Sequence, residues 1–211
     1  TSAPQSARNC VQNAPGSVVD RSTTLPGAFC TQFLADCGAD VLMIEAPGGS
    51  PVRALRGWPV LGRGKRSRVV DLRSGSGAEE LDELLSDADV AVTTFSPAVL
   101  ADLGIDSEAL LARHPQLVIT HITGWGRRGP WRDLKGYEGL VLAKAGLSHA
   151  VRRMANPPRP SYVCVPYASF AAGHIAVQGI LAALHERDRS GLGQIVDTDL
   201  VRGVHAIDAW N

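Results

Sequence analysis

The sequence predicts an α/β fold in which a largely parallel sheet carries helices on both faces, as in Rossmann-like domains. Short apolar runs typical of buried strands alternate along the chain with segments of helical periodicity, and this alternation indicates βαβ units. The 211 residues are 45% hydrophobic, which is enough for a substantial core. We therefore expect one α/β domain over residues 15–211, preceded by a flexible polar arm over residues 1–14.

The expected elements follow from local residue patterns. Apolar runs mark strands at residues 17–21, 41–45, 68–72, 89–95, 117–123 and 194–200. Apolar residues at helical spacing mark helices at residues 27–37, 77–88, 97–103, 107–113, 135–146, 170–187 and 201–210. In the first of these helices Phe29, Phe33 and Leu34 share a face, and Gly38 is suited to end it. Two irregular segments, 47–66 and 152–160, are expected to line a site or an interface.

Charge and composition argue against several classes of function. The chain has 21 basic and 21 acidic residues and a pI near 7.0, so its net charge favours neither nucleic acid nor a membrane surface. The longest apolar stretch, 168–184, is short for a bilayer and contains polar side chains, which favours a buried helix. The four cysteines and six histidines lack metal-binding spacings, so no metal is expected. A reduced, cytoplasmic location fits this composition.

Two motifs have both a functional and an ordinary interpretation. Residues 124–129 read GWGRRG, which fits the dinucleotide pattern GxGxxG, but the expected acidic residue about 20 positions further on is absent. A glycine-rich turn is therefore favoured there. A run of basic residues is ordinarily a solvated surface, but in a loop with glycines it also suits a phosphate-rich ligand. The run consists of Arg53, Arg56, Arg63, Lys65, Arg66, Arg68 and Arg73.

The segment 162–193, YVCVPYASFAAGHIAVQGILAALHERDRSGLG, resembles the active-site helix of the family III (CaiB/BaiF-type) CoA-transferases, which include formyl-CoA transferase and α-methylacyl-CoA racemase. Other pieces are similar to that family in order and spacing: LPGAFCTQFLADCGADVLMIEAPGG at 25–49, GKRSRVVDL at 64–72, ADVAVTTFSPAVLADLGI at 88–105 and ITGWGRRGPWRDLKGYEGLVLAKAG at 122–146. The resemblance implies CoA or acyl-CoA as substrate, a small carboxylate as acceptor, and an interlocked homodimer or a partner chain.

The resemblance also implies roles for single residues. The family's CoA contacts correspond here to Lys65, Phe95, Lys135 and Tyr137. Racemase relatives place a carboxylate at Glu138. At the start of the active-site helix the family has an aspartate that attacks the acyl-CoA thioester, whereas this chain has Ser169. Ala46 also departs from the family, which often has an arginine there.

The serine changes the expected chemistry. An aspartate forms a mixed anhydride that exchanges readily with a thioester, whereas a serine ester is less activated and needs a base to form. Three interpretations follow. In the first, the chain is an inactive half or subunit of a CoA-transferase, at the extreme a scaffold that binds no ligand. In the second, it is an active transferase that uses another residue, for which Glu138 is the candidate. In the third, it is another enzyme on the same scaffold, such as a racemase-like isomerase. The first is favoured.

Overall fold

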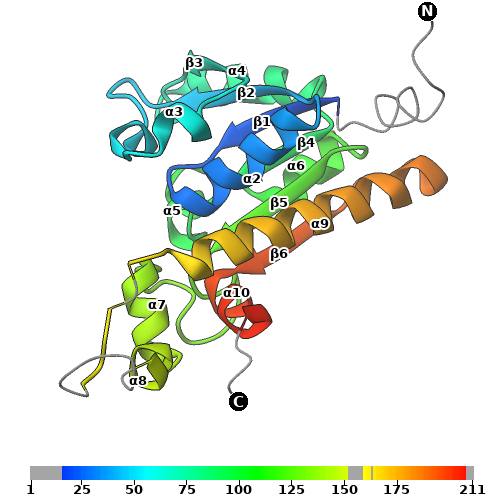
Figure 1. Ribbon diagram of the computed structural model, residues 1–211. Coiled ribbons are helices and arrows are strands. Elements are labelled where there is room, and N and C mark those ends of the chain that lie inside the picture. The colour runs from blue at the N-terminus through cyan, green and yellow to red at the C-terminus, as the bar shows by residue number, and fades with distance from the viewer. Residues whose placement is uncertain (1–15, 152–158, 163, 208–211) are drawn as a thin grey trace, which may run out of the picture.

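The computed structural model describes residues 16–151, 159–162 and 164–207, which form a six-stranded parallel sheet flanked by helices (Figure 1). The strands are β1 Ser17–Arg21, β2 Asp40–Glu45, β3 Lys65–Val69, β4 Val90–Thr93, β5 Val118–Thr123 and β6 Ile195–Asp199. They lie in the order β3-β2-β1-β4-β5-β6, and every neighbouring pair is parallel. This is the order of doubly wound α/β domains, so the predicted Rossmann-like fold is confirmed. The predicted arm, 1–14, lies outside the described residues.

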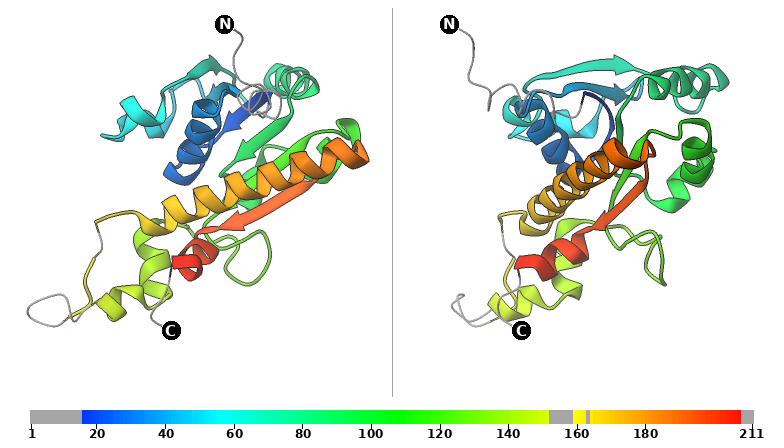
Figure 2. Two further views of the ribbon diagram at one scale, coloured as in Figure 1. Left: turned by 45° about the vertical axis from the view of Figure 1, so that its right-hand side comes forward. Right: turned by 90° about the vertical axis from the view of Figure 1, so that its right-hand side faces the viewer.

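Helices cover both faces of the sheet (Figures 1 and 2). One face packs against α2 Leu25–Asp36 and α9 Tyr167–Ser190, and α10 Leu200–Ile207 lies beside α9. The other face packs against α4 Gly75–Ser86 and α6 Ser107–Arg113. Two apolar cores result because alternate residues of a strand point to opposite faces. In β1, for example, Val18 belongs to the core under α9 and Val19 to the core under α4.

The helix that carries Ser169 is the longest of the described elements. α9 has 24 residues and ends at Ser190. The next residue, Gly191, has a φ of 75°, the left-handed conformation that commonly stops a helix. The helix begins at Tyr167, three residues before the predicted start, so Ser169 lies in its first turn. By length and composition α9 could cross a membrane, but half of its most apolar window is buried inside the domain. This burial is typical of a core helix.

The remaining differences from the expected elements have local causes. β3 starts at Lys65 instead of residue 68, because it pairs at the sheet edge with β2 from Val41 to Glu45. The predicted loop 47–66 contains η1 Pro51–Ala54 and α3 Trp58–Leu61, each with a proline at its first or second position. The expected helix at 135–146 is shorter, α7 Glu138–Lys144, and is followed by α8 Leu147–Ala150. α5 Pro97–Asp102 follows β4 as predicted, and residues 152–158 lie outside the described residues.

Candidate active site at the carboxyl ends of the strands

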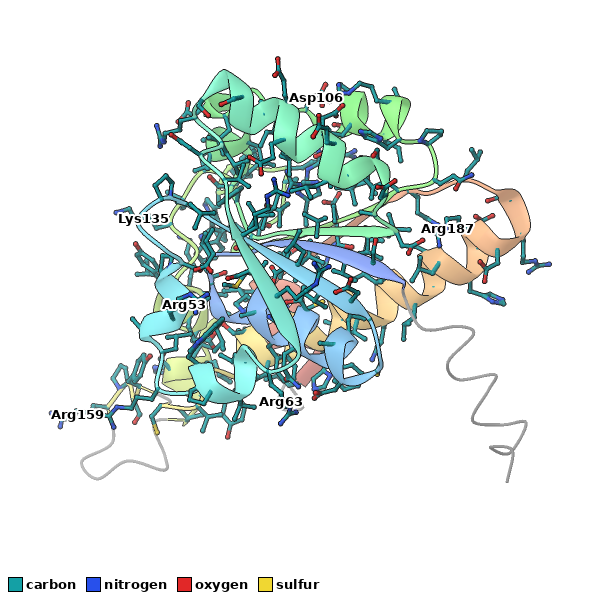
Figure 3. The ribbon with its side chains drawn as sticks, turned by 90° about the horizontal axis from the view of Figure 1, so that it is seen from above. Arg53, Arg63, Asp106, Lys135, Arg159 and Arg187 are labelled. Atoms are coloured by element: carbon teal, nitrogen blue, oxygen red, sulfur yellow. The ribbon has the colours of Figure 1, made fainter. Side chains whose placement is uncertain are left out.

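A cavity of about 340 Å3 lies at the carboxyl ends of β4 and β5. Its wall contains Thr24 from the loop after β1, Thr94 from the loop after β4, the segment 132–138 and the first turn of α9. In doubly wound sheets ligands bind at this edge, beside the two central strands whose connections leave in opposite directions. Here those strands are β1 and β4. Figure 3 shows Lys135 on this side of the molecule and Arg187, near the end of α9, on the other.

Glu138 and Ser169 meet in this cavity, although they are 31 residues apart in the sequence. The Ser169 hydroxyl donates to Glu138 Oε2 over 2.6 Å. The backbone N–H groups of Ser169 and Ala168 donate to the two oxygens of the same carboxylate, over 2.9 and 2.8 Å. The carboxylate of Glu138 therefore caps the first turn of α9.

This cap has a physical reason. The N-cap residue of α9 is Pro166, and it makes no side-chain hydrogen bond to the helix. The first N–H groups of a helix need acceptors, and negative charge is stabilised at that end by the helix dipole. Glu138 fulfils both needs from the first turn of α7. The cavity thus holds the Glu138 carboxylate and the Ser169 hydroxyl in direct contact.

Lys135 and Tyr137 line the same cavity, so four of the six residues predicted for the site are brought together. Both side chains are exposed, and the Lys135 ammonium lies 6.0 Å from the centre of the Tyr137 ring. Their segment approaches β5 closely because Gly124 packs against Gly136: a Cβ on Gly136 would lie 2.3 Å from the Gly124 Cα. The glycines of this contact therefore place the wall that carries Lys135, Tyr137 and Glu138.

Phe95 lines a second cavity, of about 470 Å3, at the carboxyl ends of β1, β2 and β4. Its neighbour Thr94 lines the first cavity. The two cavities thus flank the same turn after β4. Phe95 was predicted to contact CoA together with Lys135 and Tyr137. In the structure it lines the second cavity, whereas those two residues line the first.

Lys65 lies apart from the other predicted residues and lines neither cavity. Its side chain is 2% exposed, and its ammonium contacts the Asp20 carboxylate at 3.2 Å. It also donates to the Thr31 hydroxyl over 2.6 Å and to the Ala28 carbonyl over 2.8 Å. These contacts give Lys65 a role inside the fold, and its predicted contact with CoA receives no support from them.

The two ambiguous motifs are resolved by their surroundings. No helix begins within 124–137, so GWGRRG forms a turn, as favoured from the sequence. In the basic run, Arg53, Arg63, Lys65, Arg66 and Arg68 form ion pairs with carboxylates of the chain. Most of this positive charge is therefore neutralised within the fold. Arg56 and Arg73 have no ion pair among the described residues.

The structure adds two charged residues that the sequence pattern did not single out. Asp133 lines the first cavity next to Lys135, with its carboxylate 3.2 Å from Arg132 Nε. Arg21 lines the second cavity and is buried. The sequence offered only a weak signal for Arg21, which ends the strand SVVDR directly after a second charged residue, Asp20. Charged side chains are rarely fully buried unless they are paired.

Comparisons with known proteins agree with the α/β fold and identify the family. The sequence profile of CoA-transferase family III matches residues 16–211. A succinyl-CoA–D-citramalate CoA-transferase of Chloroflexus aurantiacus is 36% identical over 200 residues, which are 90% of this chain and 49% of the relative. The α-methylacyl-CoA racemase of Homo sapiens is 37% identical, over 92% of this chain and 49% of the racemase. A crystal structure of a CAIB/BAIF family protein from Brucella suis matches with a TM-score of 0.84 and 31% identity, over 93% of this chain and 55% of that one. The chain belongs to CoA-transferase family III.

Length separates this chain from those relatives. It spans about half the length of the curated relatives it matches. One further relative is the beta subunit of a succinyl-CoA–L-malate CoA-transferase of Chloroflexus aurantiacus, which is 32% identical over 89% of this chain and 48% of that subunit. Family members thus include subunits of assemblies with more than one kind of chain.

Proposed function

We propose that this chain binds CoA and acyl-CoA and takes part in transfer of CoA from an acyl-CoA to a carboxylate. In this proposal it acts as a half or subunit without the usual aspartate nucleophile, together with a second copy or a partner chain in the cytoplasm. The observation that carries the proposal is the first turn of α9, where Ser169 faces the cavity and its hydroxyl is bound to Glu138.

The chemistry of that turn explains why transfer is expected to need another carboxylate. In the aspartate mechanism a carboxylate oxygen attacks the thioester carbon, the C–S bond breaks, and CoA leaves as the thiolate. The acyl group then sits in an anhydride that a thiolate can attack. The Ser169 hydroxyl would have to lose its proton to Glu138 and would form a poorly activated ester. Glu138 is moreover engaged by three hydrogen bonds from α9.

Binding of CoA can be measured on the intact chain by calorimetry. We expect measurable heat with CoA, and Lys135→Ala should weaken binding by about 1–3 kcal/mol, because a charge-assisted hydrogen bond to a phosphate is lost. Arg189→Ala is the matched control, since Arg189 is exposed in the last turn of α9 and outside the described cavities at the carboxyl edge.

Two results would contradict this part of the proposal. Absence of heat with the wild-type chain would favour a scaffold that has lost its ligand. Equal affinities of Lys135→Ala and Arg189→Ala would remove Lys135 from the set of CoA contacts.

Acyl transfer tests the role of Ser169. The wild-type chain alone should transfer no acyl group, whereas Ser169→Asp should gain an acyl adduct that hydroxylamine traps and mass spectrometry detects. The new carboxylate would meet Glu138, whose Oε2 atom is 2.6 Å from the serine oxygen, and like charges at this distance repel. Ser169→Asp combined with Glu138→Gln removes this repulsion and should give the larger amount of adduct.

Ser169→Asn is the control, since it has the size of the aspartate variant and cannot form an anhydride. The proposal fails if wild-type chain alone transfers acyl groups and Ser169→Ala keeps that rate. In that case Glu138→Gln decides whether Glu138 is the nucleophile.

A second candidate function is a racemase-like isomerisation, favoured by the carboxylate of Glu138 in the cavity and by the racemase among the relatives. Isomerisation removes a proton from the carbon beside the thioester and returns it to the other face. Incorporation of deuterium from 2H2O at that carbon, lost in Glu138→Gln, would identify this activity. Transfer without such exchange would exclude it.

A further inference from the structure

A third cavity lies beside the candidate active site. It has a volume of about 530 Å3, and its wall is built by α2, the start of α9, and the segment that contains α3. Leu25 and Pro166 line both this cavity and the first one, in whose wall Ser169 lies. The residue after Ser169, Phe170, lines the third cavity. The two cavities are therefore neighbours, and a group bound beside Ser169 lies close to both.

The packing of α2 against α9 forms one wall of the third cavity. Both helices begin on the same side of the domain and run side by side (Figure 1). The rings of Phe29 and Phe170 meet edge to face, with their centres 5.0 Å apart, and both residues line the cavity. Aromatic pairs in this geometry stabilise packing beyond the area that they bury. This apolar wall is thus held by the same helix whose first turn carries Ser169.

The segment between β2 and β3 forms another wall of the third cavity. Leu55, Val60 and Leu61 line the cavity from this segment. Leu55 is 39% exposed and Val60 is 53% exposed. Large apolar side chains that gather on a concave surface leave apolar area in contact with water, and a ligand that covers this area gains free energy. The chemistry of the wall therefore favours a hydrocarbon group.

The charged and amide side chains of the third cavity do not favour an anionic ligand. Gln32 donates from its side-chain amide to the Asp36 carboxylate. Arg56 is exposed and forms no ion pair among the described residues. An exposed cation gains little from pairing in water, and its aliphatic stem can lie along an apolar surface while the guanidinium stays hydrated. A neutral hydrocarbon tail thus fits this lining better than a tail that ends in a carboxylate.

We propose that the third cavity binds the hydrocarbon tail of an acyl-CoA whose thioester lies beside Ser169. The inference rests on the proposed function and adds the class of acyl group, a neutral chain long enough to pass Leu25 and Pro166. Shorter acyl groups remain in the first cavity and gain nothing from the third. Leu55 and Val60 then select acyl-CoAs by the length of their chain.

The test measures the affinity of the intact chain for S-alkyl thioethers of CoA, which carry a tail as acyl-CoAs do and cannot transfer it. In calorimetry the affinity should rise from S-ethyl-CoA to S-octyl-CoA, by about two- to fourfold for each methylene that reaches the third cavity. Leu55→Asp should lower the ratio of the octyl to the ethyl affinity about tenfold, because a carboxylate against a hydrocarbon loses its hydration.

Leu181→Asp is the matched control. Leu181 is 43% exposed in α9 and lies outside the first and third cavities, so the ratio of its two affinities should equal that of the wild type. If Leu55→Asp does not fold, Val60→Asp makes the same change at a more exposed position of the same wall. An unchanged ratio in a folded variant of either residue overturns the inference.

The other outcomes separate this inference from the proposed function. Equal affinities of the wild-type chain for S-ethyl-CoA and S-octyl-CoA overturn the inference and leave CoA binding intact. Tighter binding of an S-alkyl-CoA that ends in a carboxylate would assign the cavity to an acidic tail beside Arg56 and overturn the hydrocarbon. S-octyl-N-acetylcysteamine carries the tail without the nucleotide. Its binding, lost in Leu55→Asp and found without any binding of CoA, would support the hydrocarbon site and contradict the proposed function.

Discussion

Replacing Lys65 by methionine is expected to lower the free energy of unfolding by about 3–5 kcal/mol, because it leaves a buried carboxylate without its cation. The carboxylate is that of Asp20, which is 0% exposed and lies 3.2 Å from the lysine ammonium. Hydrogen bonds from Ser22 and Thr31 remain in the variant, but they do not cancel its charge. Urea denaturation at pH 7 measures the loss.

A matched control is Arg66→Met on the same strand. The Arg66 and Asp40 side chains are 65% and 57% exposed and 2.6 Å apart, so their pair should contribute less than about 1 kcal/mol. Combining Lys65→Met with Asp20→Asn should restore part of the lost stability, since the unpaired charge disappears. A Lys65→Met protein of unchanged stability that no longer binds CoA would instead support the contact predicted from the family resemblance.

The fold could be predicted because it depends on a repeated pattern. Apolar strands alternating with helical segments specify parallel βαβ units. Short, right-handed connections limit the possible strand orders, but they do not fix the return of the chain from β3 to β4 on the other side of β1. The boundaries that shifted are those where a tertiary contact overrides the local pattern. β3 is the clearest case: the apolar residues Val69 and Val70 suggested a later strand, and pairing of Lys65–Val69 with β2 decided otherwise.

The candidate site could be predicted only in part. The resemblance named Ser169, Glu138, Lys135 and Tyr137, and all four line one cavity. That the Glu138 carboxylate caps α9 depends on how α7 packs against α9, which no local pattern contains. For Lys65 the sequence suggested a ligand contact that the structure does not support. A lysine in a basic, glycine-bearing loop gives no sign that its ammonium will be directed inward to Asp20. The identity of a residue indicates possible chemistry, and its packing determines whether a ligand can reach it.

Acidification is expected to destabilise this protein in part through one histidine. His121 lies in β5 at 0% exposure, with Nε2 3.0 Å from the Ser107 hydroxyl and Nδ1 without a partner among the described groups. Burial, together with the nearby charges of Arg127 and Arg21, lowers the pKa of His121 from 6.5 to about 3. Below about pH 6.5, His121 therefore binds a proton in the unfolded chain, whereas it stays neutral in the folded chain.

The sign follows from this difference in bound protons. Above pH 6.5 His121 is neutral in both states, so it does not change the free energy of unfolding with pH. Between pH 6.5 and 3 the unfolded state is favoured increasingly as pH falls. The total effect is up to about 4–5 kcal/mol, and His121→Gln should remove it while keeping a partner for Ser107. Urea denaturation of both proteins at pH 7.5, 5.5 and 4 measures the difference, which isolates the histidine from the carboxylates that both proteins share. His185→Gln, at an exposed position of α9, should follow the wild type. Parallel stability curves for wild type and His121→Gln would contradict this prediction, because they would show that β5 can accommodate a charged imidazole beside Arg21.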